Sequence, residues 1–158
     1  MGYRRKGREY ALQVLFGCDL SSGARPERGG ETSDLQAFWA ERRAAPEVRA
    51  FAESLVRGVK AHLGEIDAII ARHATNWTVD RMAAVDRNVL RLAVYELLHV
   101  SEVPERVVLN EAIEIAKKYG TVESGAFVNG VLDNIVKHES AVTETREGER
   151  THASHGRH

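Results

Sequence analysis

The sequence has little of what disulfide-bonded, membrane-spanning or secreted proteins require. Its 158 residues include one cysteine, Cys18, so no disulfide can form within the chain. No apolar run reaches the roughly 18 residues that a transmembrane helix needs. The apolar stretch after the basic N-terminus contains Gln13 and Asp19 and lacks a small-residue cleavage site, unlike a secretory signal. These absences favour a cytoplasmic protein.

Signatures of catalysis and of metal binding are also missing. The sequence has no Gly-rich phosphate loop and no His-Glu-x-x-His motif, and Cys18 has no histidine near it in sequence to act as its base. We interpret His152, His155 and His158 as solvated residues of a polar end rather than as metal ligands. Glu96 interrupts an apolar helix without an obvious partner, which favours a structural hydrogen bond or ion pair. We therefore expect a binding protein, not an enzyme, with no catalytic residue, metal or cofactor.

Positive charge is concentrated at the N-terminus, where four of the first eight residues are basic. The whole chain has 22 Lys and Arg against 23 Asp and Glu, so residues 9–158 retain 18 basic against 23 acidic residues, a formal charge of −5. A lone positive cluster on an otherwise acidic protein is typical of a surface that binds a polyanion. This basic N-terminal cluster consists of Arg4, Arg5, Lys6 and Arg8.

The spacing of apolar residues is helical nearly throughout, and no alternating strand pattern is present. This predicts an all-α protein, a single bundle of about seven helices. Residues 1–138 are expected to form one helical domain, and the polar residues 139–158, which lack periodicity, are expected to be disordered. A capping-box pattern, Ser33-x-x-Gln36, opens the second helix. The expected helices cover about residues 4–20, 33–43, 46–63, 65–75, 83–100, 104–119 and 123–137.

The helix expected at 83–100 is apolar almost all round, which is typical of the central helix of a bundle. Only Arg87, Asn88 and Arg91 form a polar stripe on it, and we expect this stripe to be solvated. Gly130 lies inside the last helix, where glycine costs about 1 kcal/mol relative to alanine. Tight packing on another helix is the expected reason for this glycine.

Two aromatic residues are candidates for stacking on RNA bases. At about 100° per residue, Arg5 and Phe16 fall within roughly 20° of each other on the first helix. Arginine binds phosphate and an exposed aromatic ring stacks on an unpaired base, so the stripe favours single-stranded RNA over a duplex. Phe127 lies near a helix N-terminus beside the small residues Gly125 and Ala126. The alternative is that Phe16 belongs to the core and the arginines are a solvated N-terminus.

Four segments carry specific motifs. Arg-Arg-Lys-Gly-Arg-Glu-Tyr opens residues 4–16, Val-Asp-Arg-Asn-Val-Leu-Arg opens residues 85–97, Val-Pro precedes Leu-Asn-Glu-Ala within residues 103–117, and Phe-Val-Asn-Gly opens residues 127–133. In this order they resemble the NusB family of bacterial transcription antitermination factors, over residues 3–137. The resemblance implies an all-α protein of two packed three-helix subdomains.

The resemblance also implies a function in assembly rather than catalysis. Together with the small-subunit ribosomal protein NusE, such proteins bind the boxA element of nascent ribosomal RNA and help RNA polymerase read through terminators. Other Nus factors and RNA polymerase are then indirect partners. The implied RNA-binding residues are the basic N-terminal cluster, Phe16 and Phe127, whereas Asp86 faces NusE and Glu123 stands where a change affects complex formation.

Two positions depart from the family pattern. Many members have tyrosine in place of Phe16, and a basic residue often stands in place of Ala126, so one hydroxyl contact and one phosphate contact are lost here. Three other readings stay open: a NusB-like domain related to RNA cytosine methyltransferases, a helix-turn-helix DNA-binding regulator, and a helical adaptor that binds only protein. No catalytic domain is expected within these 158 residues. The oligomeric state, monomer or homodimer, stays open as well.

Overall fold

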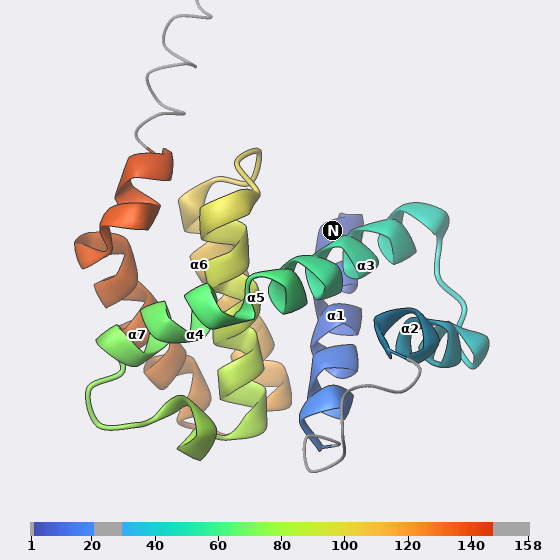
Figure 1. Ribbon diagram of the computed structural model, residues 1–158, viewed down its shortest axis with the longest axis horizontal. Helices are drawn as coiled ribbons and strands as arrows, with labels where there is room; N and C mark the ends of the chain where they lie inside the picture. The colour runs from blue at the N-terminus through green and yellow to red at the C-terminus, as the bar shows by residue number, and fades with distance from the viewer. Residues whose placement is uncertain (1, 21–29, 147–158) are drawn as a thin grey trace, which may run out of the picture. The chain divides into compact units, whose positions relative to one another are not determined.

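The computed structural model describes residues 2–20 and 30–146, and all regular elements in these residues are helical (Figure 1). This confirms the predicted all-α fold. None of these helices is both long and apolar enough to cross a membrane. The elements are α1 (Tyr3–Leu20), α2 (Gly30–Ala40), α3 (Pro46–Ala61), α4 (Leu63–His73), the 3₁₀ turn η1 (Val79–Arg81), α5 (Ala84–His99), α6 (Glu105–Tyr119) and α7 (Ser124–His138).

Proline marks two helix starts as expected, but the second helix starts earlier than its sequence pattern suggests. α3 begins at Pro46, whose fixed φ suits the first helical turn, and α6 begins directly after Pro104. α2 begins at Gly30, so Ser33 lies inside this helix and the predicted capping box is wrong. Local capping patterns therefore place helix starts less reliably than proline does in this chain.

The junction between α6 and α7 depends on a close approach at Gly120. This residue has φ −100°, which any residue adopts, but a Cβ here would overlap the side chain of Ser124. Ser124 is buried, and its Oγ accepts a hydrogen bond from the Thr121 backbone N–H at 2.9 Å. The Thr121 Oγ1 accepts a bond from the Glu123 N–H at 3.3 Å. The glycine is thus required by space and not by backbone conformation.

The chain divides into two compact units, residues 1–61 and 62–158. In the first unit, α1 packs along α3 and also contacts α2. Each of the three helices contributes buried apolar side chains; burial of a leucine or valine side chain is worth about 1.5–3 kcal/mol and that of an alanine less. They include Ala11, Leu12 and Leu15 of α1, Leu35 of α2, and Ala52, Leu55 and Val56 of α3.

In the second unit, α5 packs against α4, α6 and α7 (Figure 1). Its apolar residues are buried on every side, as the sequence predicted for the central helix; they include Val89, Leu90, Leu92, Ala93, Val94 and Leu97. Glu96 is 2% exposed and interacts within the described chain, in agreement with the predicted structural role.

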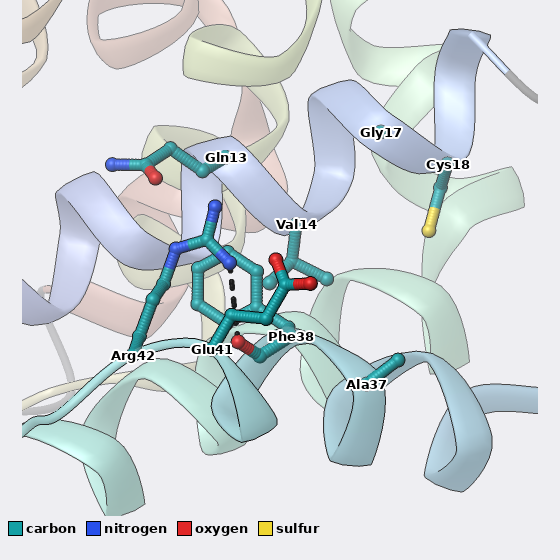
Figure 2. Close-up of a pocket in the computed structure, with 8 residues that line it drawn as sticks. All are labelled: Gln13, Val14, Gly17, Cys18, Ala37, Phe38, Glu41 and Arg42. Atoms are coloured by element: carbon teal, nitrogen blue, oxygen red, sulfur yellow. Dashed lines mark hydrogen bonds between the residues drawn. The ribbon is translucent and has the colours of Figure 1, made fainter.

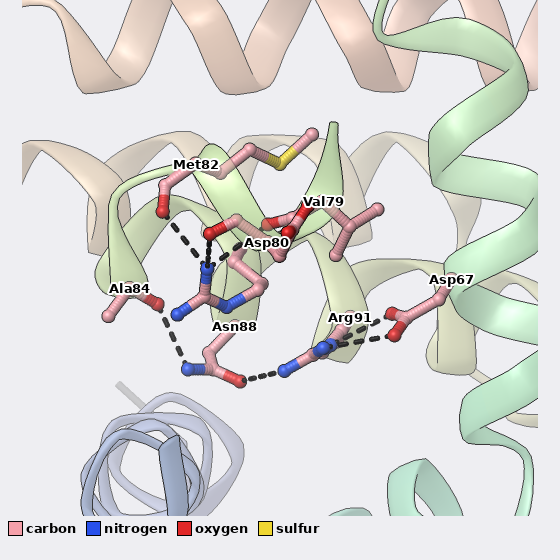
Figure 3. Close-up of polar contacts among 8 residues, drawn as sticks. Asp67, Val79, Asp80, Met82, Ala84, Asn88 and Arg91 are labelled. Carbon is pink, nitrogen blue, oxygen red and sulfur yellow. Dashed lines mark hydrogen bonds and ion pairs between the residues drawn. The ribbon is translucent and has the colours of Figure 1, made fainter. Parts of the chain in front are cut away.

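The polar stripe of α5 is not solvated, which corrects the sequence expectation (Figure 3). Asn88 is 1% exposed; its side-chain N–H donates to the Ala84 carbonyl at 2.9 Å. Its Oδ1 accepts a bond from Arg91 at 3.1 Å. The guanidinium of Arg91 donates one hydrogen bond to each carboxylate oxygen of Asp67 on α4, both at 2.9 Å. This paired geometry ties α4 to α5.

Arg87 holds the loop that precedes α5. One of its guanidinium N–H groups lies within 3.0 to 3.3 Å of three backbone carbonyls, those of Val79, Asp80 and Met82 (Figure 3). The Val79 carbonyl also accepts the Met82 N–H at 3.3 Å, and the Arg87 cation adds a donor for all three carbonyls of this turn. The first turn of α5 is therefore anchored on both sides, by Arg87 and by Asn88.

The chain continues in ordered structure beyond α7. Residues 140–146 form a further helical segment, in which Val142 is 0% exposed and Arg146 is 5% exposed. Glu139 pairs with Arg72 at 2.7 Å and with His73 at 3.0 Å. The expectation of a disordered tail from residue 139 is therefore wrong for residues 139–146, because tertiary contacts supply the burial that the local pattern lacks. Residues 147–158, with His152, His155 and His158, lie outside the described residues.

Candidate nucleic-acid interface

The basic N-terminal cluster lies on the first two turns of α1, and its members differ in exposure. Arg5 and Lys6 are exposed, and Arg4 is half-buried. Arg8 is only 3% exposed, and its guanidinium carbon lies 5.6 Å from the ring centre of Phe51 on α3. The structure therefore does not support Arg8 as a surface contact to RNA, contrary to the sequence expectation.

A close helix contact explains the burial of Arg8. A Cβ built at the neighbouring Gly7 would lie 2.7 Å from the ring of Phe51, so glycine lets α1 approach α3 at this turn. The approach closes the space around the guanidinium, which packs on the aromatic face. Sequence spacing alone does not reveal this, because Arg8 and Phe51 are far apart along the chain.

The accessible cations lie among aromatic rings. The guanidinium carbon of Arg4 lies 5.6 Å from the ring centre of Tyr3, and Lys6 Nζ lies 5.2 Å from that of Tyr10. Tyr3 is 43% exposed, and its ring makes an edge contact with Phe51 at 5.9 Å. Such cation–π contacts are worth about 0.5–1 kcal/mol at exposed sites and limit the motion of the long side chains. The result is a preformed basic and aromatic surface on α1.

Phe16 is half-buried near the end of α1. It belongs neither fully to the core nor fully to the surface, so both the stacking role and the packing role stay compatible with its environment. Residues of the same helix, Gln13, Val14, Gly17 and Cys18, line one side of a groove of about 390 Å³.

The other side of this groove comes from α2 and the two residues after it, and it brings a cation that sequence reasoning missed (Figure 2). Arg42 lies 3.9 Å from the ring centre of Phe38 and donates to the Phe38 carbonyl at 3.1 Å. Its guanidinium points across the groove toward Gln13. Arg42 is exposed, so it adds positive charge to the same unit as Arg5 and Lys6. Only the packing of α2 on α1 reveals it.

In the second unit, Phe127 lies in the first turn of α7 and is half-buried. The expected open space beside it is partly filled, because a Cβ at Gly125 would lie 3.0 Å from the side chain of Lys117. Gly130, one turn later, is exposed, and a Cβ there would meet nothing within 4 Å. The expected tight packing of Gly130 on another helix is therefore wrong. Its missing side chain instead leaves the α7 backbone open on the outside.

Asp86 lies in the first turn of α5, where its charge suits the positive end of the helix dipole. Its Oδ1 is buried and has no hydrogen-bond partner among the described residues. Arg87 and Asn88, which follow it, are both held by the contacts given above. Asp86 is thus half-buried at a rigid helix start, and its oxygen without a partner is the one that the fold covers.

Glu123 precedes α7 and is exposed. Its side chain makes no capping hydrogen bond, although its carbonyl accepts the N–H of Phe127 at 3.1 Å. The adjacent Val122 is 100% exposed, an apolar side chain on the same loop that the sequence analysis did not single out. The loop before α7 therefore exposes an acidic side chain, Glu123, next to an apolar one, Val122.

Three comparisons bear on this geometry. Residues 5–137 match the NusB family. The transcription antitermination protein NusB of Sorangium cellulosum (strain So ce56) is 47% identical over 146 residues, which is 92% of this chain and 100% of the relative. That of Geobacter sulfurreducens (strain ATCC 51573 / DSM 12127 / PCA) is 48% identical over 135 residues, 85% of this chain and 94% of the relative.

Solved structures agree. T. maritima NusB has a TM-score of 0.76 at 38% identity, covering 91% of this chain and 96% of that one. A chain of the complex of antitermination factors NusB and NusE with dsRNA has a TM-score of 0.73 at 33% identity, covering 87% of this chain and 98% of that one. Both sequence and fold match over nearly the whole described length, and this protein belongs to the NusB family.

Proposed function

We propose that this protein is a transcription antitermination factor that binds boxA-type RNA of nascent ribosomal transcripts together with NusE. The observation that carries the proposal is the exposed pair Arg5 and Lys6, with Arg4 beside them, on an otherwise acidic chain of the NusB family. The relatives named above are transcription antitermination proteins. The protein acts in the cytoplasm, where transcription occurs, and it works by assembly.

The number of accessible cations sets the strength of RNA binding. With Arg8 buried, three basic side chains of the cluster remain for phosphate contacts. For a single strand, three contacts give a slope of log K against log salt of about −2. Binding by this protein alone is therefore weak at physiological salt, and the basic NusE supplies further contacts. Phe16 and Phe127 add stacking on unpaired bases.

The form of the RNA is a separate question. Stacking on aromatic side chains favours unpaired bases, but the solved complex with NusB and NusE contains dsRNA. We retain single-stranded RNA as the proposed ligand because both half-buried phenylalanines offer ring surface that a duplex cannot use. A duplex of the same sequence belongs in the test.

NusE docks on the second unit through Asp86 and the loop before α7. Asp86 is half-buried and brings one negative charge toward a basic protein, and Glu123 adds an exposed one. Exposed charges of this kind mainly set the association rate and the orientation of the partner. Val122 supplies apolar contact at the same loop.

The first test is fluorescence anisotropy of a short boxA-like RNA, single-stranded or duplex, titrated with this protein at two salt concentrations, with and without NusE. We expect tight binding of the single strand only when both proteins are present. Lys6→Glu is expected to weaken RNA binding at least tenfold and to leave NusE pairing intact. Arg106→Glu, which reverses an exposed charge on α6, is the matched control.

The second candidate function is a helical adaptor that binds only protein. The exposed Val122 and Glu123, which the fold does not require, favour it. Pairing with NusE without RNA binding in any mixture would establish the adaptor and refute the RNA-binding role. Tighter binding of the duplex would keep the antitermination role but remove base stacking as its mechanism.

A further inference from the structure

Two histidines and one carboxylate converge in the second unit. The potential ligand atoms of His62, Glu65 and His99 all lie within 4.8 Å of one another. His62 directly precedes α4, Glu65 lies in the first turn of α4, and His99 is the last residue of α5. The sequence analysis predicted no metal ligands here because His99 is distant in sequence and forms no spacing motif with the other two.

The packing of α4 on α5 creates the cluster. His62 and Glu65 are three residues apart and share a helix face. The rings of His62 and His99 stack at 4.1 Å with an angle of 24° between their planes. Tyr95, one turn before His99, covers them, with its ring centre 5.3 Å from that of His99 and 6.2 Å from that of His62.

A neutral imidazole presents one ring-nitrogen lone pair, and this lone pair lies in the plane of the ring. Because the planes of the two rings are nearly parallel, the exposed His99 ring has to turn out of the stack before both nitrogens can point at one ion. His99 Nε2 and Glu65 Oε1 are 3.6 Å apart, too far for a good hydrogen bond.

We propose that His62, Glu65 and His99 bind a divalent transition-metal ion, Zn²⁺ being the best match. Two imidazole nitrogens and one carboxylate oxygen are a common ligand set for zinc, and water fills the fourth position. Bonds of about 2.0–2.2 Å place tetrahedral ligand atoms about 3.3 Å apart. The distances between the three ligand atoms, now up to 4.8 Å, therefore have to shorten by at most about 1.5 Å. Glu65 and His99 are exposed and can achieve this by side-chain rotation.

The two helix ends at this cluster have opposite dipoles. The C-terminal end of α5, where His99 lies, is negative and attracts a cation, whereas the start of α4, where His62 and Glu65 lie, is positive, so the attraction comes from the Glu65 carboxylate. A bound ion would tie the start of α4 to the end of α5 and thereby stabilise the second unit. This role is independent of RNA and NusE.

The test must separate this cluster from other histidines. His73 is engaged with Glu139 at 3.0 Å, whereas His138 is exposed at the end of α7 and serves as the matched control. The full chain, the double variant His62→Ala/His99→Ala, and His138→Ala are each melted with increasing Zn²⁺, in a buffer without phosphate or chelator. Imidazole nitrogen resonances of the wild type are followed by NMR in the same titration.

We expect Zn²⁺ to raise the Tm of the wild type and of His138→Ala, and to bind the double variant at least tenfold more weakly. The milder Glu65→Gln, at an exposed position, is expected to weaken binding without affecting the fold. The imidazole signals of both His62 and His99 are expected to shift together. An equal Tm rise in the double variant, or unshifted signals of either histidine at saturating zinc, would overturn the proposal.

Discussion

Arg146→Ala is expected to lower the free energy of unfolding of the second unit by about 3 kcal/mol. The guanidinium of Arg146 is buried and donates to the carbonyls of Val103 at 2.6 Å, Glu96 at 3.0 Å and Leu97 at 3.2 Å, with Val100 at the 3.5 Å limit. These carbonyls belong to the end of α5 and the loop after it. Those of Glu96 and Val100 also accept backbone N–H groups, from Val100 at 3.0 Å and from Val103 at 3.3 Å, so Arg146 matters most for the carbonyls of Leu97 and Val103. One side chain therefore caps the central helix.

The magnitude follows from the three shorter bonds. Each hydrogen bond contributes about 1 kcal/mol net, and a buried carbonyl left without a donor costs about 1–3 kcal/mol. Water entering the vacated space offsets part of that penalty, so about 3 kcal/mol is the central expectation. Arg146→Lys keeps the positive charge at the end of the helix but loses the planar fork, so about half of the loss is expected.

The assay is urea unfolding followed by far-UV circular dichroism, together with thermal melts. For a chain of this length, a loss of about 3 kcal/mol lowers Tm by about 6–12 °C. Arg106→Ala, at an exposed arginine of α6 in the same unit, is the control and is expected to be nearly neutral. A loss below about 1 kcal/mol for Arg146→Ala, indistinguishable from the control, would refute the capping role.

Three more predictions follow from single residues. Gly130→Ala should raise the free energy of unfolding by about 1 kcal/mol, because its Cβ meets no atom; destabilisation in a thermal melt would contradict this. The Arg72 hydrogen bond lowers the pKa of Glu139, so Glu139→Gln should cost about 1 kcal/mol at pH 7 and nothing below the lowered pKa, where wild-type Glu139 is protonated; a constant deficit in urea titrations from pH 3 to 7 would rule this out. Val122→Asp should weaken NusE pairing without changing Tm; unchanged calorimetric affinity would remove Val122 from the interface.

Periodicity alone predicted the helices, because each has to bury one face and α5 has to bury all of its faces. The charge cluster at the N-terminus was equally visible, since net charge requires no fold. The motifs around Arg5, Asp86 and Phe127 identified the family before any coordinates. Periodicity, charge and motifs depend only on the order of residues along the chain, so the all-α class and the candidate residues could be predicted from the sequence.

Tertiary packing decided which of those residues remain available. Arg8 has the same sequence character as Arg5, yet the close contact at Gly7 buries it on Phe51. Arg91 was expected in solvent, yet Asp67 on a neighbouring helix holds it. A long cationic side chain carries no sequence mark that distinguishes a solvated position from one next to a matching carboxylate or carbonyl.

The same reason applies to the two features that depend on residues distant in sequence. Residues 139–146 have too few apolar side chains to predict order, but Arg146 donates to carbonyls at the end of α5 and in the loop after it. His62 and His99 come together only because α4 packs on α5. The sequence by itself thus determined the helices, the charge distribution and the family. Only the tertiary structure decided burial and partners, because these depend on which helices lie side by side.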